Sequence, residues 1–348
     1  MVLKNTVRMA AVIAGLLLLS GCYLMQAARG QLAVMKARQP IDKVIANPDT
    51  TDELKQQLIQ ARRIRDFATQ ELGLPDNAAY RSYADIGRPS VVWNVVATPE
   101  FSVRPRTWCF PIAGCVAYRG YFSEKDANEF AAKLKMEGDD VLVGGVGAYS
   151  TLGFVADPLL NTVADYPEID LAALIFHELA HQMAYLPGDS SFNEAFATAV
   201  EEEGVARYAA QLQDPTALAR WQQRRKLRIE VTSLVTATRL DLAKLYREKL
   251  EPEAMRAAKK KRLDELATQV RAVEQRTGRR SGFGTYIEGG LNNAHLASVA
   301  TYYDQVPYFE TALREQCGGY LPCLYIRTQQ EVRKRTRPAA PRRPAGPR

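Results

Sequence analysis

Two of the three histidines in this chain of 348 residues stand four positions apart, with a glutamate between them. His177, Glu178 and His181 form an H-E-x-x-H pattern within LAALIFHELAHQMAYLPG. Residues i and i+4 share one face of an α-helix, so both imidazoles can bind one metal ion. Glu178 stands one position round the helix, where its carboxylate can accept a proton from an activated water. The pattern therefore predicts a zinc site with an open coordination position; the alternative is two core histidines bonded to backbone carbonyls.

The ends and the composition of this stretch support a helix. Asp165 can cap its start, Pro167 suits the first turn, and Pro187-Gly188 would end it. The residues between them are apolar nearly all round, which predicts a buried helix.

A third ligand is expected downstream, in FNEAFATAVEEEG, where 12 residues separate His181 from Glu194. The run N-E-A-F-A from Asn193 resembles the N-E-x-x-A element of the gluzincin metallopeptidases, the thermolysin-like and aminopeptidase N-like enzymes. This resemblance implies that Glu194 is the third zinc ligand, and that Glu201 is a group behind the ligands or a substitute ligand. Ser191 and Glu194 also fit a capping box, which is the metal-free alternative.

Motifs along most of the chain are similar to those of one bacterial family. They are W-C-F-P-x-x-G-C-V-x-Y-R-G-Y-F at 108–122, G-G-V-x-A-Y-S-T-L-G at 144–153, F-H-E-L-A-H-Q at 176–182 and F-N-E-A-F-A-T-A-V-E at 192–201. Over residues 20–330 the chain resembles the "putative aminopeptidase" lipoproteins of proteobacteria. Together with the metal pattern, this implies a zinc-dependent aminopeptidase with one Zn²⁺ per chain and a peptide substrate. The alternatives are an endopeptidase, a cell-wall peptide hydrolase, or a non-catalytic lipoprotein with a vestigial zinc site.

Two further stretches are candidates for completing the site. The Gly-rich run over 143–153 has the alternation of an edge strand that can pair with a peptide, although a plain turn fits equally. Aminopeptidase N relatives carry a G-x-M-E-N motif whose glutamate holds the substrate's amino terminus, and GGVGAY here has no acid. His295, Tyr302 or Tyr303 is a candidate donor to a developing oxyanion, against the alternative that these are core residues.

The N-terminus has the features of an export signal. Lys4 and Arg8 precede an apolar run over 9–19 that is too short to span a membrane. Leu19-Ser20-Gly21-Cys22 then matches a lipobox, so we expect residues 1–22 to be a lipoprotein signal peptide with Cys22 acylated. Because Tyr23 rather than aspartate follows, the periplasmic face of the outer membrane is the expected location. An ordinary signal peptide is the alternative.

Four cysteines remain after that segment, an even number for an oxidising compartment. They form two closely spaced couples, Cys109 with Cys115 and Cys317 with Cys323. We therefore expect two local disulfides, and a zinc–thiolate site is less favoured because no C-x-x-C occurs.

The formal net charge of +7 is mostly peripheral. Residues 331–348 carry seven basic residues and one acid, and the signal region adds two more basic residues. The body between them is therefore close to neutral, and nucleic acid is not an expected partner. The Pro-rich tail 331–348 is expected to be disordered, either solvated or touching anionic envelope components.

The body over 23–330 is expected to form one zincin-like domain of the α+β class, rich in helix. Its expected elements are helices over 52–72 and 124–136, strands over 91–101, 116–122 and 140–144, and a helical hairpin over 215–276 that turns near Glu251-Pro252.

Overall fold

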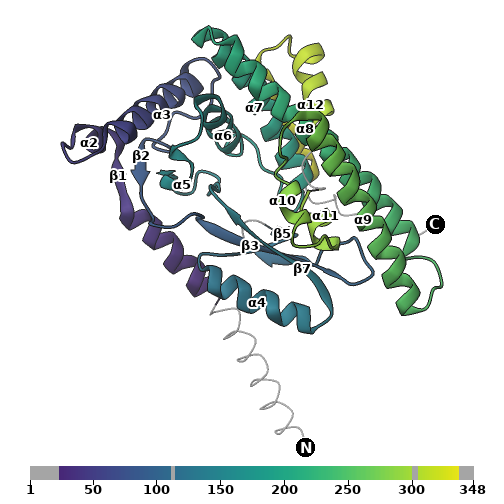
Figure 1. Ribbon diagram of the computed structural model, residues 1–348. Helices are drawn as coiled ribbons and strands as arrows, with labels where there is room; N and C mark the ends of the chain where they lie inside the picture. Colours follow the sequence, from purple (N-terminus) through teal and green to yellow (C-terminus); the bar gives the residue numbers. More distant parts are fainter. Residues whose placement is uncertain (1–22, 111–113, 300–304, 337–348) are drawn as a thin grey trace, which may run out of the picture.

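The computed structural model describes residues 23–110, 114–299 and 305–336. Helices dominate this part of the chain, and three small sheets accompany them (Figure 1). The predicted α-rich α+β class is confirmed. Within the described ranges, no helix combines the length and the apolar character needed to cross a membrane.

One three-stranded antiparallel sheet lies between two helices. Its strands, in spatial order, are β6 (Arg119–Tyr121), β3 (Val92–Pro99) and β7 (Asp139–Val146). Alternate side chains of a strand point to opposite faces. Trp93, Val95 and Ala97 accordingly pack with α4 (Glu124–Met136), whereas Val96 packs with α11 (Asn293–Val299).

The largest apolar core forms where three helices meet. These are α3 (Asp52–Gln70), α6 (Glu168–Ala180) and α7 (Ser190–Leu212). Leu171, Ile175 and Phe176 of α6 are fully buried, as the apolar composition of this helix predicts. A Cβ at Gly204 would lie 2.7 Å from the Phe176 ring, so glycine lets α7 approach α6 closely.

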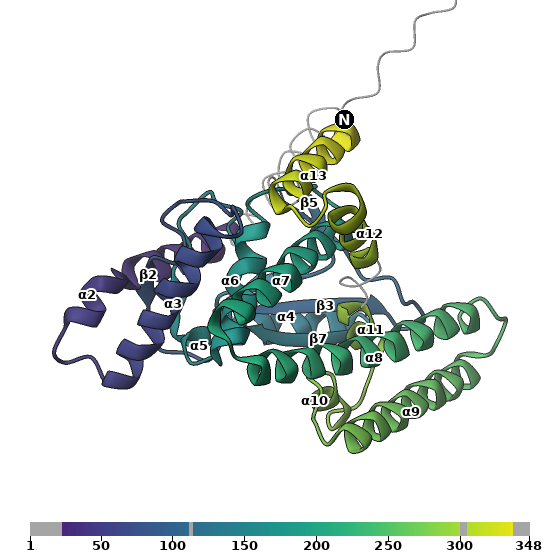
Figure 2. The same cartoon turned by 90° about the horizontal axis from the view of Figure 1, so that it is seen from above.

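The charged, glycine-poor stretch after α7 forms two long packed helices, as predicted. They are α8 (Pro215–Leu245) and α9 (Pro252–Thr277), joined by a turn at 246–251. Figure 2 shows them side by side along one edge of the molecule. They share an apolar core of their own, with Val235, Leu242, Leu266 and Val270 buried between them. This hairpin core also reaches α11 through Leu296.

Shorter elements complete the described chain. The residues over 23–37 form an N-terminal helix. The remaining elements are β1 (Arg38–Pro40), α2 (Ile41–Ala46), β2 (Ser82–Ala84), β4 (Trp108–Phe110), β5 (Gly114–Val116), β8 (Leu159–Leu160), α5 (Asn161–Ala164), α10 (Gly284–Ile287), α12 (Val306–Thr311), η1 (Ala312–Gln316) and α13 (Leu321–Thr336).

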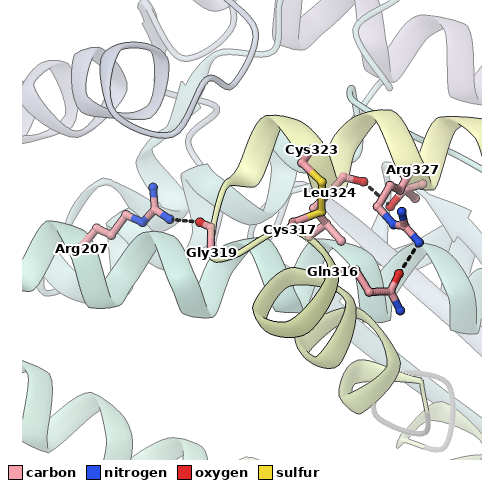
Figure 3. The surroundings of a disulfide bond; sticks show 8 residues. Arg207, Gln316, Cys317, Gly319, Cys323, Leu324 and Arg327 are labelled. Atoms are coloured by element: carbon pink, nitrogen blue, oxygen red, sulfur yellow. Dashed lines mark hydrogen bonds between the residues drawn. A yellow bond between two sulfur atoms is a disulfide. The ribbon is translucent and has the colours of Figure 1, made fainter.

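Both predicted disulfides are present. Cys109–Cys115 joins the paired strands β4 and β5, and Cys317–Cys323 joins the end of η1 to the start of α13 (Figure 3). Beside the second bridge, the guanidinium of Arg207 on α7 donates to the carbonyl of Gly319. The bridge therefore holds a turn that is fastened to the same helix that carries Glu194.

Several predicted boundaries were wrong. Strand 116–122 is interrupted at residues 117–118, between β5 and β6. The Gly-rich run over 143–153 is strand only as far as Val146, the end of the outer strand β7, and the rest is loop. Residues 331–336, which we assigned to the tail, form the end of α13, where Arg335 lies over the ring of Phe192.

Candidate metal centre

The two histidines lie at the carboxyl end of α6. The helix begins after Pro167 and ends at Ala180, so His181 is its final capping residue rather than an interior position. Asp165 instead ends the short helix α5, and the predicted cap and the predicted end near Pro187 were both wrong. His177 and His181 still lie one helical turn apart, because the His181 backbone N–H donates to the carbonyl of His177 at 3.3 Å. Their rings lie 4.9 Å apart between centroids.

Glu194 is positioned by the start of α7. Asp189 caps this helix by accepting a hydrogen bond from the Phe192 N–H at 3.0 Å. The capping box that we considered for Ser191 and Glu194 is therefore wrong, and the Glu194 carboxylate is free to face the histidines.

Asn193 fixes the loop that joins the two helices. Its side chain accepts from the Leu186 N–H at 2.7 Å and donates to the Leu186 carbonyl at 2.9 Å, and the residue is buried. These two bonds close the loop onto the first turn of α7. Asn193 thereby fixes the position of the adjacent Glu194 relative to His181.

The three side chains converge as a metal site requires. The Nε2 atom of His177 lies 3.2 Å from Oε2 of Glu194, and Nε2 of His181 lies 3.8 Å from Oε1 of Glu194. Zinc bonds of about 2.0–2.1 Å at tetrahedral angles place neighbouring ligand atoms about 3.4 Å apart. Within the described ranges, His177, His181 and Glu194 are the group of His, Cys, Asp and Glu side chains that fits around one ion. Donor types and spacing therefore both fit zinc.

Glu201 stands behind the site. Its Oε2 lies 3.0 Å from Nδ1 of His177, the ring nitrogen opposite the one that faces Glu194. Glu201 is buried, and it lies two turns beyond Glu194 on α7. A carboxylate on the outer nitrogen of a metal-binding imidazole fixes the tautomer and orientation of the ring. The geometry thus places Glu194 among the candidate ligands and Glu201 behind one of them.

The protonation equilibria of these groups follow from burial and charge. Burial opposes a charged His177 ring, but its hydrogen bonds with Glu194 and Glu201 outweigh that effect and raise its pKa well above the usual value. Burial and the neighbouring His177 lower the pKa of His181 to about 4, which keeps this imidazole neutral. Burial would raise the pKa of Glu194, but its hydrogen bond with His177 holds it low. A neutral imidazole beside an ionised carboxylate is the state that binds a metal.

Glu178 lies beside this group and is half-buried. Burial raises its pKa to about 7, the nearby His177 lowers it, and the negative charges of Glu194 and Asp157 raise it. A carboxylate that exchanges its proton near neutral pH can both accept and return a proton.

Sequence reasoning missed two tyrosines close to Glu194. Tyr118 lies between β5 and β6, and 41% of its surface is exposed. Burial and the charges of Glu194 and Glu178 raise the pKa of Tyr118 to about 12. Burial and Glu194 also raise the pKa of Tyr185. Both hydroxyls therefore keep their protons and can donate hydrogen bonds; Tyr118 falls within the W-C-F-P motif, but no spacing marked it.

Of the oxyanion donors expected from the sequence, His295 alone lies within the described residues. His295 is on α11, where its Nδ1 lies 2.8 Å from Oδ1 of Asn292 and its ring lies 5.1 Å from that of Tyr286. These contacts belong to the packing of α11 on β3 and β7. Tyr302 and Tyr303 lie outside the described residues.

Fold and site together define an α-rich α+β protein with an H-E-x-x-H helix, a glutamate on the following helix, and donor atoms spaced for a zinc ion. The family described as "Putative aminopeptidase" matches residues 22–341, and the chain belongs to that family. The chain has no significant match among curated proteins or among solved structures.

Proposed function

We propose that this protein is a zinc-dependent peptidase of the zincin type, and specifically an aminopeptidase. The observation that carries the proposal is the convergence of His177, His181 and Glu194, with the half-buried carboxylate of Glu178 on the helix of the two histidines. A site that serves structure alone has no need of an unliganded base beside an open position. The family's description points the same way.

His177, His181 and Glu194 would hold the ion, which when bound supplies a Lewis acid for water and for the scissile carbonyl. Glu178 takes the proton of the attacking water and passes it to the leaving amine, a role that its pKa of about 7 favours. Tyr118 donates its hydroxyl proton in a hydrogen bond to the oxygen that gains negative charge, and Tyr185 is the second phenol within reach. Glu201 holds the His177 ring in place.

The two disulfides support a location in an oxidising compartment, and the lipobox ending at Cys22 supports lipid anchoring there. We therefore propose the periplasm as the site of action, with anchoring in the outer membrane. The substrate is a peptide that reaches the cell envelope.

The test combines metal analysis with a matched pair of peptides, one with a free amino terminus and one acetylated there. We expect about one zinc per chain in the parent, its loss in Glu194→Ala, and its retention in Glu178→Gln with activity lowered roughly 10²–10⁴-fold. Glu203→Gln, a change on α7 beyond the candidate ligands, is the control that should behave as the parent.

Each result decides between named alternatives. Cleavage of the free peptide alone establishes an aminopeptidase, and cleavage of both establishes an endopeptidase. Zinc binding without cleavage of either peptide, in a panel that includes cell-wall peptides, would leave a non-catalytic lipoprotein with a vestigial site. A parent protein that binds no zinc contradicts the proposal altogether.

A further inference from the structure

The helix over 23–37 is held against the sheet from its first residue. The Tyr23 hydroxyl donates to the carbonyl of Gly120 at 3.0 Å, and the guanidinium of Arg119 lies 4.1 Å from the Tyr23 ring centroid. The same ring packs on Phe110, with 5.5 Å between centroids. Tyr23 follows Cys22 directly, so these contacts start at the residue next to the expected lipid attachment.

A second group of contacts holds the same helix against the body. The Gln26 side chain donates to the Gly120 carbonyl at 3.3 Å and accepts from the Phe122 N–H at 3.2 Å, so it bonds to β6 like an additional strand residue. Farther along, the Tyr149 hydroxyl donates to Gln31. The inner face of the helix is thus occupied by polar and aromatic contacts to the body.

The outer face of this helix carries apolar side chains with no core beneath them. Leu24 is 51% exposed, Met25 53% and Leu32 59%. Residues 24, 28 and 32 are Leu, Ala and Leu at helical spacing, which makes one continuous stripe. Such a run of exposed large apolar residues on a small helix marks an interaction surface.

The charges beside this stripe favour a lipid partner. Arg29 and Lys36 are exposed next to it, and the sequence over 23–37 contains no acidic residue. Basic side chains beside an apolar face are the features of helices that lie in a membrane interface and meet anionic headgroups. The proximity of the expected acyl anchor selects the membrane rather than a soluble partner.

We propose that the exposed stripe of helix 23–37 lies on the bilayer in which Cys22 is anchored, so that the body sits on the membrane without a free tether. One lipid anchor and one interfacial helix supply the two attachments that stable membrane binding requires. Arg119, which holds Tyr23, is the neighbour of Tyr118 in the chain. The helix is thus fastened to the segment that also carries Tyr118, the tyrosine proposed for the candidate metal centre.

The test uses the full acylated chain, purified from membranes and reconstituted into vesicles of phosphatidylcholine and phosphatidylglycerol. Tryptophan is placed on the stripe by Leu32→Trp, and on the hairpin by Leu240→Trp as a matched control, since Leu240 is equally exposed at 60%. The added emission over the parent is compared in plain vesicles and in vesicles whose acyl chains are brominated near the headgroup. We expect the Leu32→Trp emission to fall by about half or more and the control to be unchanged, because bromine quenches only at contact.

A further change tests the stripe itself. Leu24→Asp in the Leu32→Trp background should restore the emission, while an unchanged circular dichroism spectrum shows that the helix is retained. Equal emission from both tryptophans in the brominated vesicles would overturn the proposal. A Leu32→Trp emission that is shielded from aqueous iodide but not quenched by the brominated lipid would also overturn the proposal. That result would assign the stripe to a protein partner or to a second copy of the chain. A mass spectrum without acyl groups on Cys22 would overturn it as well.

Discussion

The Nδ1 atom of His177 lies 3.0 Å from Oε2 of Glu201, while the other nitrogen of the same ring faces Glu194 at 3.2 Å. One imidazole is thus held between two carboxylates of a single helix, two turns apart on α7. This arrangement separates the two glutamates that the sequence alone could not rank. It assigns one to the metal position and the other to the orientation of a ligand.

Removing the Glu201 carboxylate should weaken zinc binding without abolishing it. Partners of this kind typically contribute 10–100-fold in metal affinity, so we expect that loss for Glu201→Ala, measured by competition with a chromophoric chelator. Glu201→Gln keeps an acceptor for the Nδ1–H and should recover part of the affinity. Glu203→Ala, which removes a surface pair with Arg207, is the control. A parent-like affinity in Glu201→Ala would show that the bond to His177 has no part in metal binding.

Tyr118 should act in the chemical step rather than in metal or substrate binding. We expect Tyr118→Phe to lower kcat roughly 10²–10³-fold, with KM and zinc content unchanged, because one donor to the oxyanion is lost. Steady-state kinetics on the free-amine peptide give the two constants. Tyr166→Phe alters a tyrosine of similar exposure, 38%, outside the site and should leave both constants unchanged. If Tyr118→Phe keeps the parent's kcat, the donor is Tyr185 or a residue outside the described ranges.

The sequence predicted those features of the site that depend on neighbours along the chain. His177 and His181 share a face because helical spacing places them there, and local cysteine spacing anticipated both disulfides. Glu194 was found because its motif lies just beyond the loop. The long hairpin was predictable because charged, glycine-poor segments with helical apolar spacing have few other ways to bury their leucines.

The missed features depend on contacts between distant segments. Tyr118 lies near enough to Glu194 for that charge to raise its pKa, and it is held next to β6, which pairs with the distant strand β3. The end of α6 was placed too late because the Asn193 side chain holds Leu186 in a loop, and this bond outweighs the apolar pattern of 183–186. Ser191 was considered for the cap of α7, but Asp189, two residues earlier, occupies it. Competition of this kind is decided by the fold rather than by local preference.

Stability should fall as pH rises through the range in which Glu202 ionises. Burial is the largest cause that raises its pKa above the usual value of 4.5; Arg225 opposes this, and the hydrogen bond with Glu310 adds to it. The folded chain therefore binds more protons than the unfolded chain between pH 4.5 and neutrality, and the free energy of unfolding falls across that window. We expect a decline on the order of 1–3 kcal/mol, measured by urea unfolding at a series of pH values.

Glu202→Gln removes the ionisation and should flatten this decline. Glu203→Gln leaves the Glu202, Arg225 and Glu310 cluster intact and should retain it. Identical slopes for the parent and Glu202→Gln would assign the pH dependence to other groups.

Gly114 packs the hairpin of the first disulfide against the loop that joins the two helices of the candidate metal site. Its φ of +72° is in the left-handed region, and a Cβ there would lie 2.9 Å from the backbone nitrogen of Gly188. Gly188 belongs to the loop between His181 and Glu194, so Gly114→Ala should displace that loop.

Gly138→Ala is the matched control, because Gly138 has a φ of +89° but nothing within 4 Å of its Cβ position. Both changes incur a left-handed strain of about 1–2 kcal/mol, and only Gly114→Ala adds a backbone clash. We therefore expect the unfolding free energies of the two variants to be similar or to differ moderately. Zinc affinity, measured by the same chelator competition, should fall only in Gly114→Ala. Equal zinc affinities in the two variants would mean that the hairpin and the metal loop move independently.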